Sequence, residues 1–591
     1  KSKVTRPDED NIYEDRWQGG GFTFANEKNL IQNYEALLTF DKPELYQKMD
    51  LFAFAGGSYR EDSYRKVGVG TPANSNFLAP DYWSVTNTDR WPAEPDDRIR
   101  NYSQAGDLTY SVFGQATLSW DRIYYLEFQA RNDWSSTLPK NNRSYFYPGV
   151  SFTYNFSENI EIPKVNYGKF RLSWADVGRP APRYYALSPY KTVYQYINGI
   201  AGAPSLIPSE YFMIAEGLKA ERKREFVTGF NVKMFEQDRM EVDFSFYNNT
   251  VYNQIMSVAV PPGAGADKMK INAGEVRNDG VEVLLKVAPV IASNFRWDWT
   301  FTFARQWDEV VELYHGDDAS SSVAENVRNS RNGVTVKDRE GEPMGQMYMQ
   351  NFETVTDKDS PYYGQRIVQP SGLYKKSTQD EICVGNINPD FFGGIGTNFG
   401  IQGDWGAADL AVGFDYRVGG EMVSYSNSYL KANGLSKESL KYRDAAHGGL
   451  ERVNPNDASQ PFHDGVKLPG VKNIGTATAP EYVENDIIIS AYNYYRTFAP
   501  DNAYPEEVKT NNYLKLREVA LNYTLPKRIT DALKVQKLSV GLTARNLLYL
   551  YKSIPNLDPE AVLGTSSAHN WVENSNYPSS RGFGCNVKLS F

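Results

Sequence analysis

Apolar and polar side chains alternate along many segments of this chain. In NFRWDWTFTF (294–303) every second side chain is aromatic and the residues between them are polar. LTYSVFGQATLSW (108–120) and GFGCNVKLSF (582–591) have the same period of two. Successive side chains of a β-strand point to opposite faces, so this period predicts strands with one apolar and one polar face.

Roughly 16 such strands of about 10 residues can be marked, a length that crosses a bilayer at barrel tilt. Short connections near residues 121, 160, 237, 291, 404 and 529 alternate with long ones. The long connections lie at about 61–107, 132–145, 178–222, 249–275, 307–389, 419–510 and 549–579. The strands of a soluble β-sandwich show the same alternation of apolar and polar side chains. A sandwich, however, is not required to have all its long connections at one end, as an outer-membrane barrel does. The pattern predicts an all-β fold: a transmembrane antiparallel β-barrel with short periplasmic turns and long extracellular loops.

The apolar parity of a membrane barrel faces lipid, and the polar parity faces a wet lumen. The apolar set is rich in aromatics, as interfacial girdles require. The residues predicted to face lipid are Val112, Leu118, Phe128, Trp297, Trp299, Phe301, Val587, Leu589 and Phe591. An aromatic C-terminal residue is also what the barrel assembly machinery is thought to recognise. The alternative interpretation of the C-terminal strand (582–591) is an ordinary edge strand buried in a soluble fold.

Composition narrows the class of protein further. The 591 residues contain 14% aromatics and carry a formal net charge of −9, which gives no reason to expect nucleic acid as a partner. No run of 18 apolar residues can form a transmembrane helix. The first residues, KSKVTRPDED, have no apolar signal-peptide region, and we expect that the sequence begins inside a longer chain. The two cysteines, Cys383 and Cys585, are too few for a disulfide scaffold.

The sequence offers little for catalysis or metal binding. The four histidines, at 315, 447, 463 and 569, are far apart and match no zinc motif. Calcium needs six or more oxygen ligands, and the acidic pairs at 317–318, 357 and 359, and 380–381 supply too few. We therefore expect no enzyme, no cofactor and no metal.

Two predicted loops are rich in aromatics. These candidates for contact with a substrate or a lid protein are Tyr82, Trp83, Trp91, Tyr184, Tyr185, Tyr190, Tyr194 and Tyr196. Aromatic faces stack on sugar rings and pack against peptide side chains. The same residues could equally pack the loops against each other, and the sequence leaves the two interpretations open.

Charges are adjacent in KLREV (515–519). Strict alternation places Arg517 and Glu518 on opposite faces, so one of them must face the lumen or a membrane rim. A charge at the lipid midplane costs about 2–4 kcal/mol.

Six segments resemble, in order, the SusC/RagA family of TonB-dependent outer-membrane transporters, from about residue 100 to the end. They are NAGEVRNDGVEVLL (272–285), GNINPDFFGGIGTNF (385–399), FHDGVKLPGVKNIGT (462–476), NNYLKLREVALNYTLPK (511–527), LSVGLTARNLLYLYKSIPNLDPEA (538–561) and YPSSRGFGCNVKLSF (577–591). Together they are specific, although each alone is weak.

The resemblance implies a 22-stranded barrel filled by a plug domain and preceded by a TonB box. Neither plug nor TonB box is recognisable here, so residues 1–591 are expected to be the C-terminal barrel portion. It further implies a Gram-negative outer membrane with its lipid and lipopolysaccharide, a SusD-like surface lipoprotein as lid, and TonB acting through the plug. Oligosaccharides or oligopeptides would be imported. The alternatives are a passive porin, a structural or secretion-associated barrel, or a soluble multidomain protein that binds or degrades carbohydrate.

Overall fold

The computed structural model describes most of the chain. The residues outside the description are 1, 6–20, 71–77, 80–81, 83, 85–86, 88–100, 184, 186–189, 198–199, 209–211, 215–216, 260–267, 315–324, 332, 458, 477, 499–503, 563, 565–569, 575 and 578. Side chains are also outside it at 2–5, 21–23, 101–102, 190–197, 200–208, 212–214, 258–259, 325–326 and 379.

The described residues form one large sheet of 16 strands, here called the wall. Each strand pairs antiparallel with its neighbours in the order β1-β2-β3-β4-β5-β6-β7-β11-β12-β15-β16-β21-β22-β30-β31-β33. In that order the strands are Ser2–Thr5, Gly21–Tyr46, Met49–Gly70, Asn101–Trp120, Tyr124–Ser135, Ser144–Tyr154, Val165–Arg179, Glu221–Met234, Met240–Tyr252, Glu275–Ile291, Phe295–Glu312, Phe391–Gly403, Gly406–Val418, Tyr513–Thr524, Lys537–Lys552 and Gly582–Ser590.

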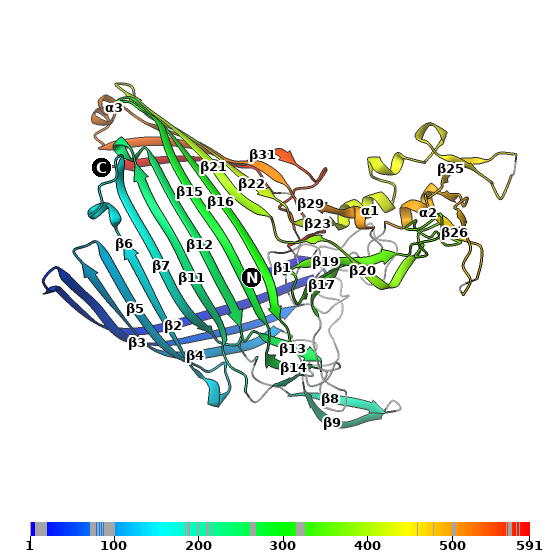
Figure 1. The fold of residues 1–591 in the computed structure, drawn as a ribbon, viewed down its shortest axis with the longest axis horizontal. Coiled ribbons are helices and arrows are strands. Elements are labelled where there is room, and N and C mark those ends of the chain that lie inside the picture. The colour runs from blue at the N-terminus through cyan, green and yellow to red at the C-terminus, as the bar shows by residue number, and fades with distance from the viewer. Residues whose placement is uncertain are drawn as a thin grey trace.

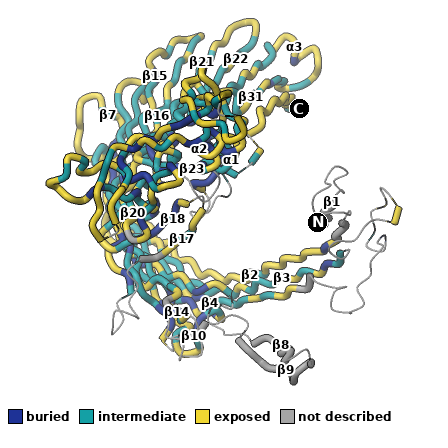
Figure 2. Tube along the Cα trace, turned by 90° about the vertical axis from the view of Figure 1, so that its right-hand side faces the viewer, coloured by how far each residue is buried: buried dark blue, intermediate teal, exposed yellow. Residues whose placement is uncertain are grey.

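The wall is a single curved layer with an open side. Figure 2 shows the arc ending at the N-terminal strands on one side and near β31 and the C-terminus on the other. Among the described residues, β1 and β33 have no pairing with each other and each has one neighbour. The sheet therefore curves like a barrel but does not close on itself within the described chain.

Short and long connections leave opposite ends of the wall. The short ones include the turn after Trp120, η3 (Phe156–Glu158), η4 (Glu236–Asp238) and α3 (Lys527–Ala532). Figure 1 shows α3 at one end and β23, α1, α2 and β25 beyond the other. Strand β3 extends to Gly70 and β4 begins at Asn101, so both run into the range predicted as loop at 61–107.

The long connections have secondary structure of their own. Their helices are α1 (Tyr425–Ala432), α2 (Ala491–Arg496) and the 3-10 turns η2 (Lys140–Asn142), η6 (Lys437–Leu440), η7 (Ala445–His447) and η8 (Pro505–Glu507). Their strands are β8 (Tyr190–Ile197), β9 (Ile200–Pro208), β10 (Phe212–Ile214), β13 (Ile255–Ala259), β14 (Lys268–Asn272), β17 (Glu325–Arg331), β18 (Val334–Arg339), β19 (Gln346–Phe352), β20 (Lys376–Asn386), β23 (Glu421–Ser424), β24 (Leu450–Arg452), β25 (Phe462–Val466), β26 (Val471–Asn473), β27 (Tyr482–Glu484), β28 (Ile489–Ser490), β29 (Val508–Thr510) and β32 (Val572–Glu573). Within the described part of the chain, no helix is both long and apolar enough to cross a bilayer.

The register of the wall gathers apolar side chains on one face. Trp299 lies opposite Val287 on β15, and from Trp299 the row continues through Thr397, Val412, Val519 and Ala544 to Phe583. The four hydrophobic clusters of the described residues lie among the long connections and at the strand ends beside them. No described layer therefore packs a core against this apolar face.

The residues predicted to face lipid share this face by strand pairing, and Phe591 directly follows β33. Six of them are exposed: Val112 (58%), Phe128 (48%), Trp299 (37%), Val587 (64%), Leu589 (44%) and Phe591 (83%). Leu118, Trp297 and Phe301 are half-buried by their neighbours. Contact of this face with lipid remains a prediction.

Arginine substitutions on the two faces of β4 test that prediction. Val112→Arg places a charge among apolar side chains and should impair assembly, since it costs about 2–4 kcal/mol near the lipid midplane. Gln115→Arg should be tolerated because Gln115 lies on the other face, where its amide donates to Glu127 at 2.8 Å. Heat-modifiable gel mobility of the protein reports assembly. Equal behaviour of the two variants would contradict the assignment of faces.

Candidate functional site

The face of the wall opposite the apolar one is lined by ion pairs. Three examples are Arg131–Asp133 at 2.7 Å, Arg171–Asp243 at 2.5 Å and Lys286–Glu241 at 3.2 Å. Most of these side chains keep part of their surface exposed. Such pairs contribute little stability in water, about 0–1 kcal/mol each. Their main effect is to make this face hydrophilic.

A pocket of about 260 Å³ lies on this polar face, over β3 to β7. Phe113, Gln129, Arg131 and Tyr147 are among its lining residues. The guanidinium carbon of Arg131 lies 5.2 Å from the centre of the Phe113 ring. An aromatic ring, a cation and an amide at one place can contact a polar solute, so this pocket is a candidate contact site on the polar face.

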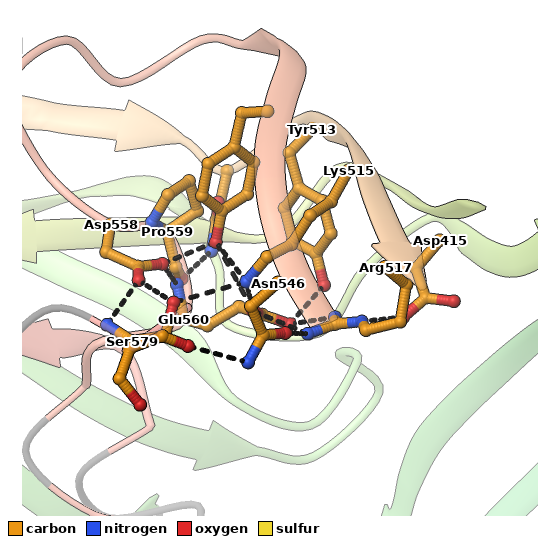
Figure 3. Close-up of polar contacts among 12 residues, drawn as sticks. Asp415, Tyr513, Lys515, Arg517, Asn546, Asp558, Pro559, Glu560 and Ser579 are labelled. Atoms are coloured by element: carbon orange, nitrogen blue, oxygen red, sulfur yellow. Dashed lines mark hydrogen bonds and ion pairs between the residues drawn. The ribbon is translucent and has the colours of Figure 1, made fainter. Parts of the chain in front are cut away.

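A second polar cluster joins β30 and β31 to the connection 553–581 (Figure 3). At its centre, Glu560 accepts from Lys515 and from both terminal nitrogens of Arg517, the latter at 2.5 and 3.1 Å. Lys515, only 1% exposed, also lies 3.2 Å from the hydroxyls of Tyr549 and Ser579. A buried ammonium is tolerated only when it is paired, so this cluster fastens the connection to the polar face.

A β-bulge places two adjacent charges on that face. Leu516 pairs with Phe414 and Glu518 with Gly413, so Arg517 is the extra residue of β30. Arg517 contacts Asp415, and Glu518 accepts from Arg545 at 2.8 Å. The prediction that Arg517 and Glu518 lie on opposite faces is therefore wrong. The extra residue shifts the alternation and keeps both charges away from the apolar side.

Hydrogen bonding holds the acidic residues of this connection in the charged form. Burial alone would raise the pKa of Asp558. Donation from the Ser579 and Tyr549 hydroxyls and from the backbone amides of Glu560 and Ser579 outweighs burial and lowers that pKa to about 2. The pKa of Glu560 is also lowered, because Arg517 and Lys515 outweigh its burial.

Three long connections share one hydrophobic core beside the end of the wall. Val336 and Met347 come from 313–390, Val423 from 419–512, and Trp571 and Val572 from 553–581. A neighbouring cluster packs Phe352 and Val368 against Val466, Leu468, Ile489, Ala491, Tyr495, Phe498 and Tyr504. These connections therefore form a packed cap beside the end of the wall.

The structure describes only part of the predicted aromatic contact set. Tyr82 is 61% exposed, and the buried amide of Asn87 donates to its carbonyl at 2.7 Å. Tyr185 packs its ring under the ammonium of Lys270, 3.6 Å from the ring centre, so this residue joins two connections. Trp83, Trp91 and Tyr184 lie outside the described residues. So do the side chains of Tyr190, Tyr194 and Tyr196, whose backbone forms β8.

Sequence reasoning did not find the Asp558–Glu560 cluster. Both acids stand in the quoted segment ending LDPEA, and Lys515 and Arg517 stand in KLREV, but 43 or 45 positions separate the partners. Among the described residues, no group of three His, Cys, Asp or Glu side chains is arranged to hold a metal ion.

A curved antiparallel sheet with one apolar and one polar face, and long connections at one end, defines the barrel class of membrane proteins. The family model "TonB dependent receptor-like, beta-barrel" matches residues 4–547. The chain therefore belongs to the β-barrel family of TonB-dependent receptors. Members of this family are receptors and transporters rather than enzymes.

Individual relatives agree with this assignment. The TonB-dependent receptor P3 of Formosa agariphila is 24% identical over 96% of this chain and 53% of its own length. The TonB-dependent receptor SusC of Bacteroides thetaiotaomicron is 25% identical over 42% of this chain and 25% of its own length. The RagAB peptide transporter structure has a TM-score of 0.69 at 19% identity, covering 97% of this chain and 56% of that one. This last similarity concerns the fold. The chain spans about half the length of the relatives that it matches end to end.

Removal of the central carboxylate should destabilise the cap. Glu560→Ala leaves the buried Lys515 ammonium without its acid, and breaking a buried pair costs about 3–5 kcal/mol. We expect a lower thermal unfolding midpoint in detergent and faster proteolysis within 553–581. The matched control is Glu518→Gln, whose partner Arg545 is 67% exposed in its side chain. Its cost should stay below about 1 kcal/mol. Similar shifts in both variants would contradict the proposed anchoring.

Acid should release the same connection. The pKa of Asp558 is lowered to about 2 in the folded chain, against about 3.9 in an unfolded one. The contribution of the Asp558 carboxylate to the free energy of unfolding is therefore complete above about pH 4 and is lost as the pH falls toward about 2. Pepsin should cut wild-type receptor more slowly than Asp558→Asn at pH 4, and the two rates should converge near pH 2. A difference that persists at pH 2 would argue against this role of Asp558.

Proposed function

We propose that this chain is the barrel portion of a SusC-like outer-membrane importer that takes up oligosaccharides or oligopeptides with energy supplied through TonB. The observation that carries the proposal is the family match over residues 4–547. The likeness to SusC and to the RagAB fold supports it.

The open side of the wall supports a larger barrel. Unpaired strand edges are not tolerated in hydrocarbon, so a membrane wall must close. We propose that further strands, about six in a barrel of 22 by resemblance to the SusC/RagA family, complete it in the full-length protein together with a plug and a TonB box. The matched relatives are about twice as long as this chain, which fits such an arrangement.

The packed cap suggests how partners are arranged. We propose that its outer surface meets a SusD-like surface lipoprotein that covers the mouth. The polar face, with its ion pairs and the pocket beside Arg131, would line the route of the substrate. The exposed Tyr82 is a candidate contact for the lid or the substrate, and so are Trp83, Trp91, Tyr184, Tyr190, Tyr194 and Tyr196. Lipid and lipopolysaccharide would surround the apolar face after insertion by the barrel assembly machinery.

Uptake measurements separate this function from a passive pore. Cells with the full-length receptor should accumulate a labelled oligosaccharide or oligopeptide pool, and deletion of TonB should reduce uptake to the level of a receptor deletion. A SusD-like lipoprotein should copurify with the receptor. Uptake that depends on the receptor but not on TonB would favour a passive porin. Unchanged uptake after receptor deletion would favour a structural or secretion-associated barrel.

A further inference from the structure

A pocket lies in the outer part of the cap, between the end of α1, η6, β25 and α2. Its volume is about 370 Å³. Figure 1 shows α1, α2 and β25 beyond the end of the wall opposite α3. Its polar lining residues include Asn433, Ser439, Arg443, Asp464, Tyr492 and Arg496. None of the site residues predicted from the sequence is among them.

Counting contacts among the described residues, two guanidinium groups in this pocket retain free hydrogen-bond donors. Arg443 donates through one terminal nitrogen to the carbonyl of Gly434 and, at 3.5 Å, to the hydroxyl of Ser439. Arg496 donates through one terminal nitrogen to the side-chain oxygen of Asn433 at 3.3 Å. A guanidinium carries five N–H donors. Among the described residues, neither arginine has a carboxylate within ion-pair distance.

The acid in the lining does not neutralise these two cations. Asp464 is paired with Arg452 through two contacts of 2.7 and 3.2 Å. Arg443 and Arg496 are both exposed, so the pocket has a net positive lining that is open to solutes. These arginines also interact favourably with the partial negative charge of the carbonyl groups at the end of α1. That interaction uses only some of their N–H donors.

The elements that carry the two arginines are fastened to each other. The hydroxyl of Tyr495, which precedes Arg496, donates to the carbonyls of Glu438 at 2.8 Å and Lys441 at 3.1 Å. Tyr495 is 8% exposed and packs in the cap core. The pocket is therefore formed before any ligand arrives, which lowers the entropic cost of binding.

We propose that this pocket binds a saccharide unit that carries a carboxylate or sulfate group. Guanidinium groups recognise such oxyanions through paired charge-assisted hydrogen bonds. Tyr492, 70% exposed, offers a flat ring for stacking on a sugar. The exposed amide of Asn433 and the half-buried carboxylate of Asp464 supply donors and acceptors for hydroxyl groups. The aliphatic side chains of the lining are those of Ala432 and Ala491, which leave little apolar depth for peptide side chains.

This inference rests on the proposed import function and narrows its substrate to anionic glycans. Calorimetric titration of the purified full-length receptor in detergent tests it with four probes of equal length. The probes are a tetragalacturonate, a sulfated galactan tetrasaccharide, neutral maltotetraose and tetraglutamate. We expect one of the two anionic saccharides to bind, with affinity that falls as salt rises, and maltotetraose not to bind.

Three variants connect binding to the pocket. Arg496→Gln, the double variant Arg443→Gln/Arg496→Gln and Tyr492→Ala should each weaken binding, the double variant by about tenfold or more, as expected for lost hydrogen bonds to charged groups. Arg528→Gln on α3 removes the same charge at the other end of the wall and should bind like wild type. Arg496→Gln breaks a single described hydrogen bond, so its unfolding midpoint should match wild type.

Several results would overturn the assignment. They are binding that is insensitive to all three variants, binding of tetraglutamate in place of the saccharides, equal binding of maltotetraose, or no binding of any probe. Because the titration needs neither TonB nor the lid, loss of TonB-dependent uptake with intact binding would contradict the proposed function alone. Loss of binding with intact uptake would contradict the pocket alone.

Discussion

Pairing of backbone hydrogen bonds in hydrocarbon is the constraint on which the rest of this structure depends. A strand that crosses lipid must have its amides and carbonyls satisfied by neighbours, because no water is available there. From β2 to β31 the wall meets this requirement with antiparallel partners on both sides. Antiparallel order sends successive connections to opposite ends, so short turns can gather at one end and elaborate connections at the other. The same constraint requires β1 and β33 to find partners before the wall can stand in a membrane.

Within that frame, side-chain chemistry separates the two faces. The apolar face has no described layer against it, while the other face pairs its charges strand by strand. The bulge at Arg517 shows that charged side chains stay on the polar face even where two charges are adjacent in the sequence. One extra residue disrupts the ladder locally, yet it allows Arg517 and Glu518 to share the polar face. Arg517 and Lys515 then hold Glu560, so the segment that keeps charge out of the apolar face also anchors a connection.

The cap is held together differently from the wall. The wall depends on backbone pairing, whereas the connections bury Val423, Trp571 and their neighbours in cores drawn from three separate segments. Because these cores are independent of lipid, the cap can present rigid surface features, such as the pocket beside Arg496, at some distance from the wall. A receptor built in this way can vary its outer surface without changing its wall.

Much of the wall is determined by local sequence. A period of two in 294–303 is enough to place Trp297, Trp299 and Phe301 on one face, because alternation is a property of the strand itself. Turn positions and the all-β class follow from the same pattern. The sequence could not show the bulge at Arg517, since an inserted residue is visible only against the neighbouring strand. It could not bring Glu560 to Lys515, or place Arg443 and Arg496 in one pocket, because these arrangements arise from the folding of long connections. Strand periodicity is local and can be read along the chain, whereas the packing of loops depends on contacts between distant segments that only the tertiary structure decides.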